Sequence, residues 1–206
     1  MKLYTSKVAP SPKKIEVVIA EKNIDDVQFI DLDLALAEHK TEEYKKIAPN
    51  SRVPALVLDD GTVILETTAI ARYLDKIYPE PNLFGENPIE IASIELWYSR
   101  VTFELMMPLM FGFRHTHPHM ANLEKQFPEY GLSQRELAVK SLKKFDSIIC
   151  DTEYLAGNKY SYADIQMAVS LAFLVPVNRL NLMDYPCLLY TSDAADDTPC
   201  VDLGGR

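Results

Sequence analysis

The sequence predicts two folded units of different class, an α/β unit followed by an all-helical unit. Residues 1–78 mix strand and helix signals, whereas residues 88–186 show almost only helical periodicity. Between them, residues 79–87 form a proline-rich stretch that neither a helix nor a sheet accommodates easily. We therefore expect one domain at 1–78, a linker at 79–87 and a helical domain at 88–186.

The first unit should have the element order βαβ, a short helix, then ββα. Residues 2–5 form a short apolar strand, and a helix should follow with Ser11 as its N-cap and Pro12 at its first position. This helix should end near Asn23. Alternating apolar and polar residues predict a second strand at 27–34.

A β-hairpin is expected around Asp60-Gly61, a pair typical of tight hairpin turns. Its strands should span 54–58 and 62–65. A helix should then begin at Glu66 and end before Pro79. Its apolar face should carry Ile70, Tyr73, Leu74 and Ile77.

Helical stripes predict the elements of the second unit. A long helix over 88–113 is indicated by apolar residues three and four positions apart, namely Ile94, Tyr98, Val101, Leu105 and Leu109. Pro108 should kink this helix. A second stripe consists of Ala138, Leu142, Phe145 and Ile149. Ser161 and Asp164 have the spacing of a capping box that opens a further apolar helix.

Composition excludes several classes of function. The chain has 206 residues, 48% of them hydrophobic and 25% charged, enough to bury a core. Its formal charge of -9 disfavours nucleic acid and anionic membranes as partners. Neither a long apolar run nor a signal peptide is found, so we expect a cytoplasmic protein. The three cysteines have no metal-ligand spacing and predict no disulfide framework.

Residues 187–206, "CLLYTSDAADDTPCVDLGGR", differ from everything before them. They lack helical periodicity, and from Thr191 onward they offer almost nothing to bury. The string resembles the translation of a transposon-type sequencing adapter. We therefore expect 187–206 to be adapter read-through that replaces the natural sequence after Pro186. A natural disordered tail is the alternative.

The motif "HTHPH" places His115, His117 and His119 at alternate positions near the end of a predicted helix. Three histidines can bind a metal ion, but no carboxylate or cysteine is positioned nearby to complete the site. We expect a polar loop here and no metal site.

Two sequence features near the predicted hairpin indicate a ligand site. Val53-Pro54 comes directly before a strand, where Pro54 is either an edge residue or part of a cis bond. A cis bond would expose the Val53 amide and carbonyl to a peptide pairing as an extra strand. Glu66-Thr67 opens a helix whose free amides favour a carboxylate, while the Glu66 side chain could hold an ammonium group. A ligand with both groups, such as an amino acid, would fit.

Three motifs in order make the chain resemble the glutathione S-transferase superfamily. They are "LYTSKVAPSPKKI", "NSRVPALVLDDGTVILETTAIARYL" and "YLAGNKYSYADI", and the similarity extends over residues 1–186. The resemblance implies a thioredoxin-like first domain and a homodimer. It also implies that Val53, with Pro54, pairs with the cysteinyl backbone of glutathione, that Glu66 and Thr67 hold its γ-glutamyl end, and that Lys40 and Arg52 meet its glycine carboxylate.

The implied chemistry requires a glutathione thiolate, since a thiol is a poor nucleophile. Ser11 is the favoured hydrogen-bond donor to the sulfur, and Ser6 and Tyr4 are its rivals. An ordinary capping role for Ser11 is the alternative. No cysteine lies near the first helix, which argues against members that form mixed disulfides through their own thiol.

A hydrophobic electrophile is the expected second substrate. Its pocket could be lined by Tyr98, Phe103, Met107 and Met110, although any single one of them fits a helical core or a subunit interface better. The predicted function is conjugation of glutathione to such electrophiles, with glutathione as co-substrate and no cofactor. The alternatives are a glutathione-dependent disulfide reductase and a non-catalytic module that binds proteins or ligands.

Overall fold

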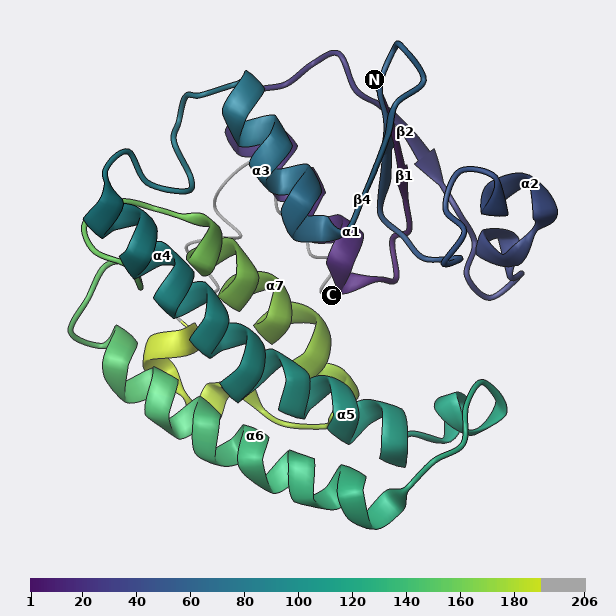
Figure 1. The fold of residues 1–206 in the computed structure, drawn as a ribbon. Helices are drawn as coiled ribbons and strands as arrows, with labels where there is room; N and C mark the ends of the chain where they lie inside the picture. Colours follow the sequence, from purple (N-terminus) through teal and green to yellow (C-terminus); the bar gives the residue numbers. More distant parts are fainter. Residues whose placement is uncertain (190–206) are drawn as a thin grey trace. The chain divides into compact units, whose positions relative to one another are not determined.

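The structure is a computed structural model that describes residues 1–189. The chain divides into two compact units, Met1–Asn82 and a second that begins at Leu83. The boundary lies inside the proline-rich segment 79–87. The first unit contains a four-stranded sheet and the second is helical, so the predicted fold class is confirmed (Figure 1).

The sheet of the first unit is mixed and has the order β2-β1-β3-β4. β1 (Lys2–Thr5) pairs in parallel with β2 (Gln28–Asp31) and antiparallel with β3 (Ala55–Val57), which pairs antiparallel with β4 (Val63–Leu65). β2 is shorter than the predicted 27–34 because the chain turns after it. The Asp33 carboxylate accepts hydrogen bonds from the amides of Ala35 and Leu36, at 2.8 and 3.1 Å, which stabilises a turn.

Helix α1 (Pro10–Glu21) connects β1 to β2 and begins earlier than predicted. Its N-cap is Ala9, in extended conformation at φ -116° and ψ 130°, and Pro10 occupies the first position. A residue that precedes proline favours this extended conformation. The prediction that Ser11 is the N-cap is therefore wrong, and Ser11 lies at the second position of the helix.

The predicted hairpin around Asp60-Gly61 is confirmed. Gly61 has φ +86°, and the Asp60 carboxylate accepts a hydrogen bond from the Thr62 amide at 2.8 Å. The chain then enters α3 (Thr67–Ile77), whose buried face consists of Ile70, Ala71 and Leu74. Ile77 was predicted on this face, but it lies at the end of the helix and is exposed.

Two short helices lie between β2 and β3. They are the 3-10 turn η1 (Glu38–Lys40) and α2 (Glu42–Lys45). Thr41 is the N-cap of α2, and its hydroxyl accepts a hydrogen bond from the Tyr44 amide at 3.3 Å. Tyr44 is the buried residue of α2.

The second unit contains α4 (Pro88–Arg100), α5 (Met107–Thr116), α6 (Pro128–Ile149) and α7 (Tyr162–Val177). The 3-10 turns η3 (Pro118–Asn122) and η4 (Leu182–Asp184) are in the same unit. Both predicted apolar stripes contribute to one core cluster, which includes Val101, Leu105 and Leu109 together with Leu142 and Phe145 of α6.

A π-helical segment, η2 (Val101–Met106), separates α4 from α5. The sequence predicts a proline kink here, and the departure from α geometry lies just before Pro108. Proline lacks an amide hydrogen, and its ring crowds the carbonyl four residues earlier, which belongs to Glu104 in η2. The wider π turn accommodates this proline within a continuous helical segment.

The predicted capping box at the start of α7 is confirmed. The Ser161 amide and hydroxyl both donate to the Asp164 carboxylate, at 2.9 and 2.7 Å, and the Leu155 amide donates to it at 2.8 Å. Burial raises the pKa of Asp164, and these hydrogen bonds oppose the shift. Both oxygens of the Asp164 carboxylate thus accept hydrogen bonds that fix the start of α7.

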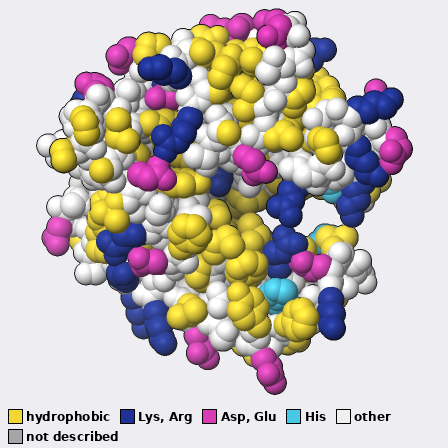
Figure 2. Space-filling view, viewed as in Figure 1, with side chains coloured by type: hydrophobic (Ala, Val, Ile, Leu, Met, Phe, Trp, Pro, Cys, Tyr) yellow, Lys and Arg dark blue, Asp and Glu magenta, His cyan; other side chains and the backbone are white. Residues whose placement is uncertain are grey.

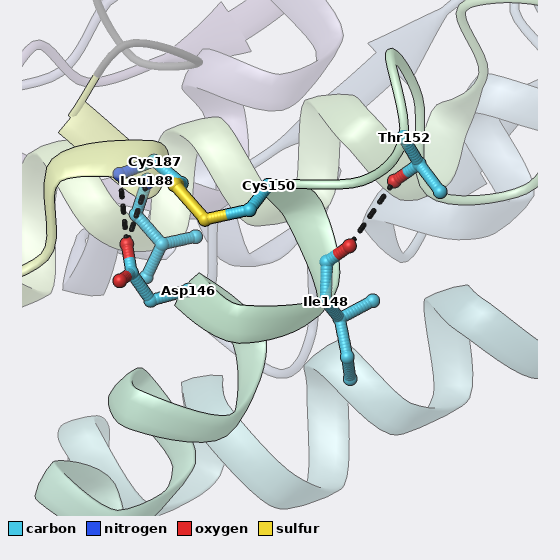
Figure 3. Close-up of a disulfide and its surroundings, with 6 residues drawn as sticks. All are labelled: Asp146, Ile148, Cys150, Thr152, Cys187 and Leu188. Carbon is cyan, nitrogen blue, oxygen red and sulfur yellow. Dashed lines mark hydrogen bonds between the residues drawn. A yellow bond between two sulfur atoms is a disulfide. The ribbon is translucent and has the colours of Figure 1, made fainter.

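The expectation of no disulfide is contradicted. Cys150, just after α6, and Cys187 are joined by a disulfide, with their Cα atoms 5.2 Å apart (Figure 3). The Asp146 carboxylate accepts hydrogen bonds from the amides of Cys187 and Leu188 at 2.9 and 3.0 Å. The 37-residue separation conceals this proximity in the sequence, because the fold alone returns the chain to the end of α6.

Residues 187–189 are therefore part of the helical unit, and Leu188 is fully buried in its core. The rest of the segment predicted to be adapter read-through, 190–206, lies outside the described residues.

In the described part of the chain, 1–189, no helix is long and apolar enough to cross a membrane. Acidic and basic side chains are interspersed over the face drawn in Figure 2.

Candidate functional site

The register of the sheet brings the candidate residues of the first unit to one end of it. Ala55 pairs with Leu65 on one side and with Tyr4 on the other. The next positions along these strands, Pro54 and Glu66, therefore lie opposite each other across a gap of about one strand spacing, roughly 4.8 Å. The loop that leads from β1 to the start of α1 leaves from the same end of the sheet.

Val53-Pro54 is a cis peptide bond. β3 is an interior strand of the sheet, so the alternative that Pro54 lies on a sheet edge is excluded. Val53 is half-buried and Pro54 is buried. The chain approaches this bond through Ser51, at φ +54°, and through Arg52, whose amide donates to the Asn50 side chain at 3.2 Å.

Glu66 is the N-cap of α3 and has a left-handed φ of +69° with ψ 127°. Such a conformation is uncommon for a residue other than glycine and is frequent at functional sites. Its carbonyl accepts the Ile70 amide at 3.0 Å, but its side chain makes no capping hydrogen bond. The exposed carboxylate of Glu66 thus stands beside the first amides of α3, where Thr67 is half-buried.

The three candidate thiol partners differ in environment. Ser11 lies in the first turn of α1 and is half-buried, and it has no capping role. Ser6 follows β1 and is buried, and its carbonyl accepts the Ala9 amide at 3.2 Å. The ring of Tyr4 packs against the ring of Tyr44, with centroids 5.5 Å apart. Ser11 is the candidate that combines partial exposure with a helix N-terminus.

The two basic candidates are both exposed. Lys40 ends η1, and Arg52 precedes the cis bond. Next to Lys40, the His39 Nδ1 atom is buried and has no hydrogen-bond partner among residues 1–189. Burial and then the Lys40 charge lower the pKa of His39. His39 is a polar group that the sequence reasoning missed, and its only signal was its position beside Lys40.

Sequence reasoning also missed Tyr44 and Lys14. Tyr44 belongs to a small buried cluster beneath the site and donates a hydrogen bond from its hydroxyl to the Arg52 carbonyl, at 2.7 Å. Lys14 lies one turn after Ser11 and is buried, and this burial lowers its pKa to about 8. An aromatic residue and a lysine on amphipathic helices carry no motif that would single them out.

The predicted electrophile-pocket residues all belong to the second unit. Tyr98 and Met110 pack against its core cluster, and the Tyr98 ring lies 5.4 Å from the ring of Tyr162. Met107 is half-buried. Phe103 is 70% exposed, on the π-helical segment η2.

Two of the three histidines of "HTHPH" accept local hydrogen bonds through their rings. His115 Nδ1 accepts the Phe127 amide at 3.4 Å, and His117 Nδ1 accepts the His119 amide at 3.3 Å. Within 1–189, the one group of His, Cys, Asp and Glu atoms close enough to hold a metal is Asp146 with Cys150 and Cys187. The sulfur atoms of Cys150 and Cys187 are bonded to each other in the disulfide, so neither is a thiolate that could bind a metal ion.

The fold and the site define a class of protein in which a small α/β domain with a cis-proline site precedes a helical domain. A family model described as "Glutathione S-transferase, N-terminal domain" matches residues 9–77. Glutathione S-transferase 2 of Saccharomyces cerevisiae is 35% identical over 176 residues, 84% of this chain and 76% of that protein.

Two further comparisons extend this similarity. The crystal structure of Gtt2 from Saccharomyces cerevisiae superposes with a TM-score of 0.87 at 31% identity, covering 98% of both chains. Protein URE2 of Candida albicans is 29% identical, over 98% of this chain and 57% of that protein. The chain belongs to the glutathione S-transferase family, as its motifs predict.

Proposed function

We propose that this protein is a glutathione transferase that conjugates the glutathione thiolate to hydrophobic electrophiles. The observation that carries the proposal is the joint arrangement of Val53-Pro54 and Glu66-Thr67 at one end of the sheet. A module that only holds protein partners has no need of groups that match both the main chain and the charged end of a tripeptide.

Each end of glutathione has a matching group in the proposal. The Val53 amide and carbonyl would pair with the cysteinyl main chain as an added strand. The Glu66 carboxylate would hold the ammonium group of the γ-glutamyl end, and Thr67 with the first amides of α3 would hold its carboxylate. Lys40 and Arg52 would neutralise the glycine carboxylate.

The chemical step starts from the bound thiolate. Lowering a thiol pKa of about 8.5 by about two units requires roughly 2.7 kcal/mol of preferential thiolate stabilisation. A hydroxyl donor contributes about 1.5 to 3 kcal/mol and a helix N-terminus about 0.3 to 1 kcal/mol, so Ser11 could supply this. The thiolate electron pair then forms the S–C bond, and a leaving group departs with its own bonding pair or the electrophile accepts the pair.

Glutathione binding is the first test of this function. Calorimetric titration should give a dissociation constant in the micromolar to millimolar range, and Glu66→Ala should abolish binding because it removes the partner of the ammonium group. Thr62→Ala, in the exposed hairpin turn, is the control. A folded wild-type chain that binds no glutathione would contradict the proposal.

Ser11 is tested separately through the thiolate itself. Ser11→Ala should raise the pKa of bound glutathione, followed by the ultraviolet absorbance of the thiolate. The matched variants Ser6→Ala and Tyr4→Phe should leave this titration unchanged. A shift in either of them, with none in Ser11→Ala, would transfer the role to the rival residue.

One comparison favours a second function. The similarity to a protein named URE2 covers 98% of this chain, and that name is not a transferase name. A non-catalytic glutathione transferase-like module is therefore the second candidate. It predicts no turnover of any electrophile and has no need of a glutathione site, whereas a disulfide reductase would consume two glutathione molecules per disulfide reduced. We also propose a homodimer, the state typical of the family.

A further inference from the structure

Tyr44 lies directly beneath the candidate glutathione site. It is 3% exposed and forms a small cluster with Ala48 and Ala55, separate from the core of the helical unit. Partly buried side chains pack around this cluster from several segments of the first unit, namely Tyr4, Leu32, Ile47, Val53 and Leu65. The packing of Tyr44 therefore helps to fix the positions of these segments relative to one another.

The Tyr44 hydroxyl acts on one peptide group. It donates a hydrogen bond of 2.7 Å to the carbonyl oxygen of Arg52. That carbonyl and the Val53 amide belong to the same peptide bond, which is planar and trans, so the N–H points away from the C=O. Fixing the Arg52 carbonyl toward the cluster thus directs the Val53 N–H to the opposite side, away from Tyr44.

Tyr44 is itself held in place at both ends. Its amide donates to the Thr41 hydroxyl at 3.3 Å, and its ring packs on Tyr4 with centroids 5.5 Å apart. Burial, with a further contribution from Tyr4, raises the pKa of the Tyr44 phenol to about 12. The phenol therefore stays protonated, and remains a donor, throughout the physiological pH range.

We propose that Tyr44 is a positioning residue for glutathione, orienting the Arg52-Val53 peptide so that the Val53 amide can pair with the cysteinyl main chain of the ligand. The proposal rests on the proposed glutathione site. A hydrogen bond accepted at the carbonyl also polarises the same peptide and strengthens its N–H as a donor. Tyr44 has no direct contact with the ligand in this mechanism.

Tyr44→Phe tests the proposal because it keeps the ring and removes the hydroxyl. Loss of one such hydrogen bond corresponds to about 0.5 to 1.5 kcal/mol. Calorimetry should therefore show glutathione binding weakened roughly 2- to 12-fold. The matched control is Tyr78→Phe, which removes a hydroxyl that donates to Asp26 at 3.0 Å, at the far end of α3 from Glu66. It should leave binding unchanged.

A second ligand separates this role from an effect on Lys40, which lies four residues before Tyr44. γ-Glutamylcysteine has the cysteinyl main chain but lacks the glycine that Lys40 and Arg52 would meet. Tyr44→Phe should weaken this dipeptide by the same factor as glutathione. A loss confined to glutathione would overturn the proposal, as would unchanged binding of both ligands.

The folded state is checked by circular dichroism and thermal unfolding of each variant. Should Tyr44→Phe not fold, Tyr44→Met is the second variant, with the same expected loss. A wild-type chain that fails to bind glutathione would overturn the proposed function and this inference together. Wild-type binding with an undiminished Tyr44→Phe would overturn the role of Tyr44 alone.

Discussion

The buried charge of Lys14 makes a prediction about stability. Burial lowers its pKa from 10.5 to about 8, whereas in the unfolded chain it returns to the ordinary value. Between these values the unfolded chain binds a proton that the folded chain has lost, so the free energy of unfolding rises with pH over this window. Each pKa unit corresponds to about 1.4 kcal/mol, so the effect amounts to a few kcal/mol at most.

Lys14→Met should therefore stabilise the protein at pH 7, and its advantage over the wild type should shrink as the pH rises toward 10. Thermal unfolding at pH 7 and pH 9.5 measures this difference. Lys76→Met, on the exposed side of α3, is the control and should shift unfolding little at either pH. If Lys14→Met stabilised the protein equally at both pH values, the prediction would be contradicted, because the cost of burying the Lys14 charge would not be the cause.

Some site residues were predictable from the sequence. Val53-Pro54 was singled out because a proline before a strand is either an edge residue or part of a cis bond, and Glu66 because an acid beside free helix amides could hold an ammonium group. The positive φ of Glu66 was not predicted. Tyr44 was not singled out, since its role depends on a hydrogen bond to Arg52 that only the folded chain creates. Ser11 was misplaced by two helical positions because two prolines, Pro10 and Pro12, could each open α1.

At the level of elements, α5 and α6 pack closely along each other through two glycines. A Cβ at Gly112 of α5 would lie 2.6 Å from the Arg135 side chain of α6. A Cβ at Gly131 of α6 would lie 2.7 Å from Thr116 and 2.8 Å from His115, both on α5. Each helix thus contributes one position without a side chain at the closest approach.

Gly131→Ala is expected to destabilise the helical unit. Alanine gains about 1 kcal/mol of helix propensity over glycine, but overpacking costs about 1 to 3 kcal/mol. Overpacking should prevail, because the added methyl would also lie 3.1 Å from the His115 backbone, which cannot move alone. Denaturant unfolding measures the change, with the exposed Glu136→Ala as control. A Gly131→Ala variant more stable than the wild type would show that α5 and α6 can move apart at a smaller cost than the gain in helix propensity.

Elements with strong local signals were predicted well, and those set by distant contacts were not. Asp60-Gly61 and the Ser161-Asp164 box each fix a local geometry through their own side chains. The π-helical segment η2 was predicted only as a proline kink. Its two buried residues, Val101 and Leu105, continue the four-residue spacing to Leu109, so the apolar pattern does not reveal the wider turn.

At the level of the whole molecule, the origin of residues 187–206 affects how the second unit ends. Cys187 is the first residue of that segment. It forms the disulfide with Cys150, and its amide donates a hydrogen bond to the Asp146 carboxylate (Figure 3). Leu188 fills a buried position in the core cluster. A three-residue apolar start, Cys-Leu-Leu, can occupy such a place whatever its origin, because burial depends on side-chain type and not on ancestry.

Resequencing the source locus past the Pro186 codon should therefore give a continuation different from "CLLYTSDAADD". The expectation follows from the match of the string to a translated adapter and from the lack of helical periodicity after Pro186. The natural continuation should instead show apolar residues three and four positions apart, since the helical unit needs a side chain where Leu188 lies. The same tail recovered from independently prepared DNA would refute the adapter origin and make the Cys150–Cys187 bond a feature of the natural chain.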